Sequence, residues 1–247
     1  MDEVKLTIIG SMGAYATADN PSSGYLLQHD GFSLMLDFGS AVHASLQRHL
    51  DSGIPDAVYF SHYHPDHTAD AGVLQHAVKV QTDLGNRSGC LPFYGMPGNA
   101  FYEKLTYHNY TNKEPVIAGE THAIGPFSCS FLENPHPDGS LCIRVECAGR
   151  SLVYTGDTGW NEKLADFAAG CDLLLCESSL FNRFKGLVQG HLTAGEVGVL
   201  ASKSEVGQLL LCHFPHYGNI EELKNEAAAE FEGIINLALP QAVYNLT

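Results

Sequence analysis

The stretch that decides the fold is SHYHPDH, residues 61–67, which directly follows the apolar run AVYF. Within it, His62, His64, Asp66 and His67 place three imidazoles and one carboxylate in six residues. In an extended chain His62 and His64 point to the same side, and the two later residues can turn after the proline toward a neighbouring position. Nitrogen and oxygen donors of this kind suit zinc, manganese or iron(II). The stretch therefore predicts a metal site in a loop at a strand end, rather than a polar surface loop with chance histidines.

On both sides of this stretch the apolar pattern changes from strands to helices. KLTIIG, GYLLQHD and SLMLDFG are typical of strands, with Asp30-Gly31 as the turn between the last two. After residue 67, TADAGVLQHAVKVQ predicts a helix, LPFYG a strand, and GNAFYEKLTYH, residues 98–108, a second helix. The order in the first half is thus strands first, followed by alternating helices and strands.

The second half repeats this order. FSCSFLENPH and SLCIRVECAGRSLVYTGDT predict strands, with Ala148-Gly149-Arg150 turning the chain back antiparallel. A helix from about Asn161 to Ala169, the strand DLLLCES, a helix capped by Thr193 with Glu196 at capping-box spacing, the strand QLLLCHF and the helix NIEELKNEAAAEF follow. Both halves together predict an α/β (α+β) protein with two β-sheets, helices outside them, and a single domain over residues 1–247.

Composition limits the possible classes of protein. The 247 residues are 45% hydrophobic and 17% charged, as expected for a soluble globular protein. The start MDEVKLTIIG has acidic residues where a signal peptide would be basic, and no apolar run approaches the ~20 residues of a membrane span, so we expect a cytoplasmic protein without a membrane segment. The seven cysteines include no Cys-x-x-Cys pair and are expected to be reduced core residues.

The charge argues against a protein that binds long nucleic acids. The formal net charge is −15, and the 13 lysines and arginines are scattered along the chain. Non-specific affinity for nucleic acid comes from such cations neutralising phosphates. A small molecule is therefore the expected substrate or partner.

The motif at 62–67 resembles the His-x-His-x-Asp-His motif of the metallo-β-lactamase superfamily. That family also has a later histidine, a bridging aspartate and a last histidine, each at a strand end. This chain offers His136 in ENPHPDG, Asp157 in VYTGDTG and His213 in LLLCHFPH, in the same order. The resemblance implies a four-layer αβ/βα sandwich and two divalent metal ions, zinc first, with manganese or iron(II) as alternatives. It assigns His62, His64 and His136 to one ion, Asp66, His67 and His213 to the other, and Asp157 to both.

Within the superfamily, the segment GHLTAGEVGVLASKSEVGQLLLCHF, residues 190–214, is similar to ribonuclease Z and related phosphodiesterases. The similarity includes NPSSGYLL at 20–27 and LDFGS at 36–40. This similarity implies that His191 is the acid that protonates a leaving alkoxide. It also implies that Asp66 and His191 are both catalytic residues. It also implies that Asp37 supports the metal-binding loop by hydrogen bonding. The alternatives are that His191 only precedes the helix cap and that Asp37 only ends a strand.

One departure from ribonuclease Z affects the substrate. That enzyme carries a long arm for transfer RNA, commonly inserted between the third-motif histidine and the bridging aspartate. Here 20 residues separate His136 from Asp157, and a single hairpin uses them. Together with the net charge of −15, this favours a smaller phosphodiester.

The first hypothesis is therefore a di-metal phosphodiesterase in which a hydroxide between the metals attacks a small phosphodiester. Two cations ~3.5–4 Å apart lower the pKa of a shared water toward ~7 and stabilise charge on the attacking and leaving oxygens. The alternatives are hydrolysis of a thioester, lactone or amide on the same centre, 3′ processing of transfer RNA, and a sensor that keeps the ligands without turnover. A β-lactamase is disfavoured because Asp66 and Asp157 follow the phosphodiesterase-like pattern, and relatives of this kind suggest a homodimer.

The loop 178–190 has two interpretations. Phe181, Arg183, Phe184 and Lys185 precede His191 and could stack a base and neutralise a phosphate. The favoured alternative is a solvated connection.

Overall fold

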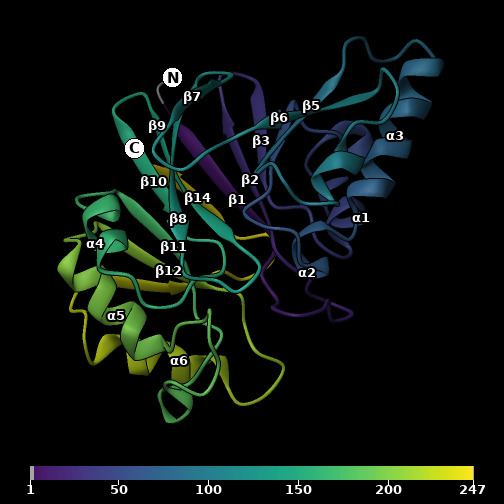
Figure 1. Ribbon diagram of the computed structural model, residues 1–247. Coiled ribbons are helices and arrows are strands. Elements are labelled where there is room, and N and C mark those ends of the chain that lie inside the picture. The colour runs from purple at the N-terminus through teal and green to yellow at the C-terminus, as the bar shows by residue number, and fades with distance from the viewer. Residues whose placement is uncertain (1–2, 247) are drawn as a thin grey trace.

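Two β-sheets with helices on their outer faces form the computed structural model, which describes residues 3–246 (Figure 1). Each sheet has seven strands within this range, in the orders β14-β1-β2-β3-β4-β5-β6 and β13-β12-β11-β10-β9-β8-β7. The strands are β1 (Val4–Gly10), β2 (Gly24–His29), β3 (Phe32–Leu36), β4 (Ala57–Tyr59), β5 (Leu91–Gly95), β6 (Thr111–Pro115), β7 (Thr121–Ile124), β8 (Phe127–Asn134), β9 (Ser140–Cys147), β10 (Arg150–Tyr154), β11 (Leu173–Glu177), β12 (Gln208–Cys212), β13 (Ile234–Leu237) and β14 (Val243–Leu246). The helices are α1 (Val42–Leu46), α2 (Pro65–Thr68), α3 (Ala71–Asp83), α4 (Glu162–Ala168), α5 (Ala194–Lys203) and α6 (Ile220–Ala228), with 3₁₀ helices η1 (Asp51–Gly53), η2 (Tyr102–Leu105) and η3 (Asn182–Phe184).

The core lies in three layers because the central strands are buried on both faces. In β1, Leu6 and Ile8 face the opposite sheet, whereas Ile9 packs under the outer helices. Such alternation over two buried faces explains why these strands are continuous apolar runs. Helices α1 and α3 cover the first sheet, and α4, α5 and α6 cover the second (Figure 1). The predicted four-layer αβ/βα sandwich is confirmed, and its shared core between the sheets supports our proposal of one domain.

The parallel part of each sheet determines where a site can form. Strands β3 to β6 are parallel, as are β10 to β13, with helices or loops as crossovers. Carboxyl ends of parallel strands meet at the same edge of a sheet, which is where ligands bind in such folds. The loops that follow β3, β4, β10 and β12 carry the motif residues except His136, which follows the antiparallel strand β8.

Most local predictions agree with the structure. The turns at Asp30-Gly31 and Ala148-Gly149 have left-handed backbone angles at both central residues, as two-residue hairpin turns require. Helix α5 begins with a complete capping box between Thr193 and Glu196. Helix α4 spans Glu162–Ala168 with Asn161 as its N-cap, close to the predicted range of Asn161 to Ala169.

The predicted helix over 98–108 is wrong. Only Tyr102–Leu105 is helical there, as the short 3₁₀ helix η2. Tyr102 and Leu105 are both buried, and their spacing of three matches the three-residue turn of a 3₁₀ helix, so one turn buries both side chains. Thr106 is already extended and leads toward β6.

The cysteines are free throughout the described chain, and five of the seven are buried, as expected of reduced core residues. No helix between residues 3 and 246 is long and apolar enough to cross a membrane. The first two residues of the acidic N-terminus, on which the cytoplasmic prediction partly depends, lie outside the described residues.

Candidate metal centre

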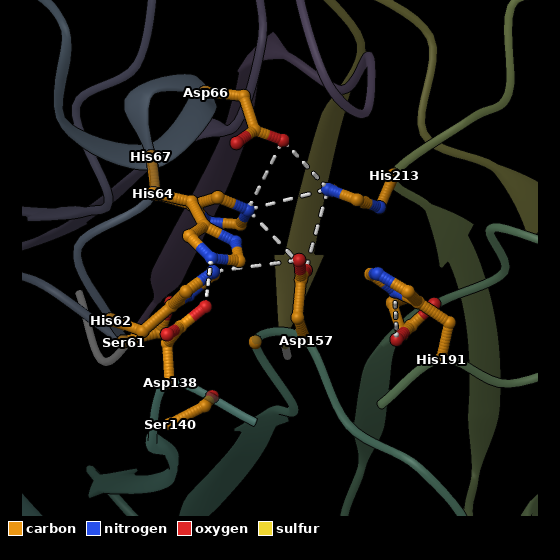
Figure 2. Close-up of polar contacts among 12 residues, drawn as sticks. Ser61, His62, His64, Asp66, His67, Asp138, Ser140, Asp157, His191 and His213 are labelled. Carbon is orange, nitrogen blue, oxygen red and sulfur yellow. Dashed lines mark hydrogen bonds and ion pairs between the residues drawn. The ribbon is translucent and has the colours of Figure 1, made fainter. Parts of the chain in front are cut away.

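All of the predicted metal-binding residues meet at one edge of the two sheets. Figure 2 labels all of them except His136. They come from the loops after β4, β8, β10 and β12 and from helix α2. They form two clusters that share Asp157: His62, His64, His136 and Asp157 in the first, and Asp66, His67, Asp157 and His213 in the second.

The second cluster has the dimensions of a tetrahedral metal site. Nε2 of His67 lies 3.3 Å from Nε2 of His213. Oδ2 of Asp66 lies 3.1 Å from the His213 nitrogen and 3.6 Å from the His67 nitrogen. Oδ1 of Asp157 is 3.3 Å from each of these nitrogens. Four donors at ~2.0–2.1 Å from one zinc ion would lie ~3.3 Å apart at the corners of a tetrahedron.

The first cluster is more open. Oδ2 of Asp157 lies 3.5 Å from Nε2 of His62, so the two oxygens of this carboxylate face different clusters. The imidazole centroids of His62, His64 and His136 lie 4.7 to 5.0 Å apart. His62 is buried, whereas the side chain of His64 is partly exposed. This cluster therefore faces solvent on one side, where a substrate can enter.

Asp37 fixes the orientation of His67 from beneath the second cluster. Its buried carboxylate accepts hydrogen bonds from the backbone and hydroxyl of Ser61 and from the hydroxyl of Tyr154, each at 2.7 Å. It also lies 2.7 Å from Nδ1 of His67. Because Nδ1 donates this hydrogen bond, Nε2 is the ring nitrogen that faces the cluster and would bind a metal. The predicted supporting role of Asp37 is confirmed.

A second carboxylate, which the sequence analysis missed, holds His64. Oδ2 of Asp138 lies 2.7 Å from Nε2 of His64 (Figure 2). This contact leaves Nδ1 as the free nitrogen of that ring. A signal was present in ENPHPDG, where the acidic residue stands two positions after His136, but its partner lies 74 residues away in the chain.

Glycines allow the loops to approach one another closely. A Cβ on Gly13 would lie 2.8 Å from the ring of His213, and one on Gly39 would lie 1.9 Å from the carbonyl oxygen of Asp66. His213 itself has φ 56°, a conformation that non-glycine residues rarely adopt and that often occurs at functional sites. Close packing and local strain thus aim this imidazole at the cluster.

The protonation states differ between the clusters: in the second, burial lowers the pKa of His67 and His213, but the neighbouring carboxylates, Asp157 first, outweigh it and raise the pKa of both rings. In the first, burial lowers the pKa of His62 well below its usual value, with the charge on His67 adding to the effect. Burial also lowers the pKa of His136, so both rings favour the neutral form that binds metals. For Asp66 and Asp157 burial raises the pKa, but the neighbouring histidines outweigh it and hold both carboxyl groups ionised.

The buried cluster atoms that lack a hydrogen bond to any residue between 3 and 246 include Nε2 of His62 and Oδ1 of Asp157. Unpaired buried polar atoms are costly, and here both point into the clusters. A divalent cation would satisfy them, and imidazole with carboxylate is a donor set that suits zinc, manganese or iron(II). The residues therefore fit the expected metal ions.

His191 lies beside the shared Asp157, away from Asp138 and His64 (Figure 2). Its Nδ1 is 3.0 Å from Oε1 of Glu177, a buried carboxylate at the end of β11. Burial lowers the pKa of His191, but Glu177 outweighs this and raises the pKa to about 9. The pKa favours the protonated form of His191 at neutral pH, with Nδ1 engaged and Nε2 without a hydrogen bond to any residue between 3 and 246. Glu177 was missed by the sequence analysis, since its strand DLLLCES indicated only burial.

The residues that one interpretation of the loop 178–190 assigned to substrate contacts have partners within the protein. Phe181 is fully buried, and Arg183 packs over the rings of Phe181 and Phe184 near Glu222. Lys185 pairs with Glu196. The end of the loop instead lines a hollow of about 560 Å³ together with His136, Trp160 and His191.

Comparison with known proteins agrees with the fold and the motif residues described above. Residues 17–196 match the family model described as the metallo-beta-lactamase superfamily. "Probable metallo-hydrolase YhfI" of Bacillus subtilis is 36% identical over 95% of this chain and 97% of that protein. The crystal structure of YhfI superimposes with a TM-score of 0.93 at 34% identity, with all of both chains covered. A ribonuclease Z of Thermoplasma volcanium is 23% identical over 93% of each chain. A diphosphatase of the PhnP family shares the fold, with a TM-score of 0.77 at 17% identity over 99% of this chain and 97% of that one.

Proposed function

We propose that this chain, which belongs to the metallo-β-lactamase superfamily and is a metallo-hydrolase, hydrolyses a small phosphodiester with the help of two metal ions. The observation that carries the proposal is the pair of clusters that share Asp157, with the Glu177–His191 pair beside them. Similarity to ribonuclease Z supports phosphodiester chemistry. Zinc is the first choice of metal.

The proposed ligands are the seven residues of the two clusters. His62, His64 and His136 would hold one ion, Asp66, His67 and His213 the other, and Asp157 both, because its two oxygens face different clusters. When bound, two such ions supply a nucleophilic water of lowered pKa and Lewis-acid stabilisation of the phosphate.

His191 provides the proton that the leaving group needs. Its Nε2 is free because Nδ1 contacts Glu177, and that nitrogen can donate to an alkoxide oxygen as the phosphorus–oxygen bond breaks. Glu177 also accepts from the backbone of Thr158 at 2.9 Å, which fixes the carboxylate and thereby the ring of His191. His191 is thus a proposed catalytic acid, and Glu177 positions it.

Thioester, lactone or amide hydrolysis on the same centre is the alternative, since one fold supports several chemistries. A parallel assay of the metal-loaded protein with bis(p-nitrophenyl) phosphate, an acyl thioester and a cephalosporin separates these classes. We expect the phosphodiester to have the highest kcat/KM. Faster turnover of the thioester or the cephalosporin would overturn the proposed class.

Precursor transfer RNA is expected to be a poor substrate. Between His136 and Asp157 the chain forms only the hairpin of β9 and β10, which offers no extended arm within the described residues. With a net charge of −15, few cations are available to neutralise RNA phosphates, so kcat/KM at physiological salt should be lower by about 10²-fold or more than for a small diester. Gel assays of 3′ processing measure this, and efficient cleavage would contradict it.

Asp138 should matter for metal affinity although it is exposed. Asp138→Ala frees Nε2 of His64 and lets the ring rotate, so we expect metal affinity at the first cluster to fall by about 10–100-fold. Competition with a chromophoric chelator measures the two affinities separately. Glu120→Ala is the matched control, because Glu120 forms a similar exposed pair with His122 at 3.0 Å outside the site. Equal affinities in both variants would show that Asp138 has no positioning role.

A further inference from the structure

A second hollow borders the clusters on the side of His213. Its volume is about 370 Å³, and both His191 and His213 reach its wall. The rest of the wall is mostly apolar and is formed by Ala14, Tyr15, Leu180, Phe214, Pro215 and Tyr217. Gly13, Ser179 and His216 complete it. Volumes of this size are typical of pockets for small ligands. His191 therefore stands between this hollow and the one beside Trp160.

The distinctive part of this wall is a fixed aromatic surface. The ring of Tyr15 stacks on the imidazole of His216, with centroids 3.6 Å apart and planes 9° from parallel. Tyr15 nevertheless remains 60% exposed, so the ring face away from His216 is open. Nε2 of His216 donates to the carbonyl oxygens of Gly13 and Tyr15, each at 2.9 Å, which holds the two loops together.

The same loop is tied to the proposed metal ligands. The backbone N–H of Ala14 donates to Oδ2 of Asp66 at 2.7 Å, so the ring of Tyr15 has a fixed position relative to the second cluster. A preformed rigid surface loses little conformational entropy when a ligand binds.

We propose that this hollow, named here the Tyr15 pocket and formed by the residues listed above, binds a flat aromatic substituent of the substrate, with the ring stacked on the open face of Tyr15. The inference rests on the proposed phosphodiesterase function and refines it. The substrate is then a phosphodiester that carries an aromatic ring on one side of the phosphate. Its phosphate lies at the clusters, and its second substituent extends past His191 toward the hollow beside Trp160.

An aromatic occupant suits this wall better than an alkyl or charged one. No lysine or arginine is among the residues that form the pocket, and His191 at its wall is already paired with Glu177. The apolar side chains of Leu180, Phe214 and Pro215 favour burial of carbon atoms, and the parallel Tyr15–His216 stack extends naturally by one more ring. Stacking of a base on an aromatic side chain is sequence-tolerant and strong enough to orient a substrate.

The test is a binding experiment on the metal-loaded protein. Isothermal titration calorimetry compares phenyl phosphate, cyclohexyl phosphate and methyl phosphate. We expect phenyl phosphate to bind about 5- to 100-fold more tightly than methyl phosphate, and more tightly than cyclohexyl phosphate, because stacking requires a flat ring. Tyr15→Phe should keep this preference, whereas Tyr15→Ala and Tyr15→Leu should lose it at unchanged metal content.

Trp160→Ala is the matched control, because Trp160 is a partly exposed aromatic residue in the hollow on the other side of His191. It should leave the preference for phenyl phosphate intact. Equal affinities of phenyl and methyl phosphate for the unaltered protein, or a preference lost in Trp160→Ala but kept in Tyr15→Ala, would overturn the assignment. Since no turnover is measured, a failure of the phosphodiesterase proposal in the parallel substrate assay would be seen separately.

Discussion

Asp157→Ala is expected to lose metal from both clusters and to lower kcat/KM on a small phosphodiester by at least about 10³-fold, because two-metal catalysis contributes several kcal/mol and each 1.36 kcal/mol is a factor of ten. The carboxylate is buried, with Oδ2 facing His62 at 3.5 Å and Oδ1 facing His67 and His213 at 3.3 Å. Its removal takes one donor and one negative charge from each cluster. Elemental analysis after gel filtration measures the remaining metal per chain.

His136→Ala is the matched comparison, because His136 belongs to the first cluster alone. That variant should lose one ion and keep the other. If the Asp157→Ala protein is folded and binds both ions with the affinity of the unaltered protein, Asp157 is not a shared ligand.

His191→Ala is expected to lower kcat/KM by about 10²–10⁴-fold on diesters with alkoxide leaving groups, the usual contribution of a general acid. With a p-nitrophenolate leaving group, which departs without a proton, the loss should be much smaller. Metal content should stay unchanged, since the seven proposed ligands do not include His191. Glu177→Gln should also lower kcat/KM more for alkoxide than for p-nitrophenolate leaving groups, but by a smaller factor, because the ring of His191 loses its charged partner at 3.0 Å.

The contrast between leaving groups separates three roles for His191. A structural residue would slow both kinds of substrate alike, and a metal ligand would reduce the metal content. Equal losses on alkyl and nitrophenyl diesters, measured side by side with metal content, would remove the assignment of His191 as the acid.

The parts of this site that are local in sequence could be predicted, whereas contacts between distant segments could not. SHYHPDH concentrates four donors after one strand, and the later histidines and aspartate also stand at strand ends. Asp138 and Glu177 gave no comparable signal, because each acts on a histidine that only folding brings near. The Tyr15 pocket likewise joins residues about 200 positions apart.

The incorrect helix prediction has a physical cause as well. GNAFYEKLTYH has helical spacing, but a single 3₁₀ turn buries Tyr102 and Leu105. For the loop 178–190, a substrate contact was the less favoured of two interpretations; Phe181 is covered by the core, and Arg183 stacks on Phe181 and Phe184. Composition identifies a segment rich in aromatic and basic residues, but it does not say which of these side chains have no partner within the protein.

The central claim is that two metal ions in the shared clusters hydrolyse a phosphodiester. Its most direct test is to titrate the metal-free protein with zinc or manganese and to measure bis(p-nitrophenyl) phosphate hydrolysis against bound metal per chain. We expect negligible turnover without metal and maximal turnover as the bound metal approaches two ions per chain. Full turnover by the metal-free protein, or a maximum already reached at one ion, would contradict the claim.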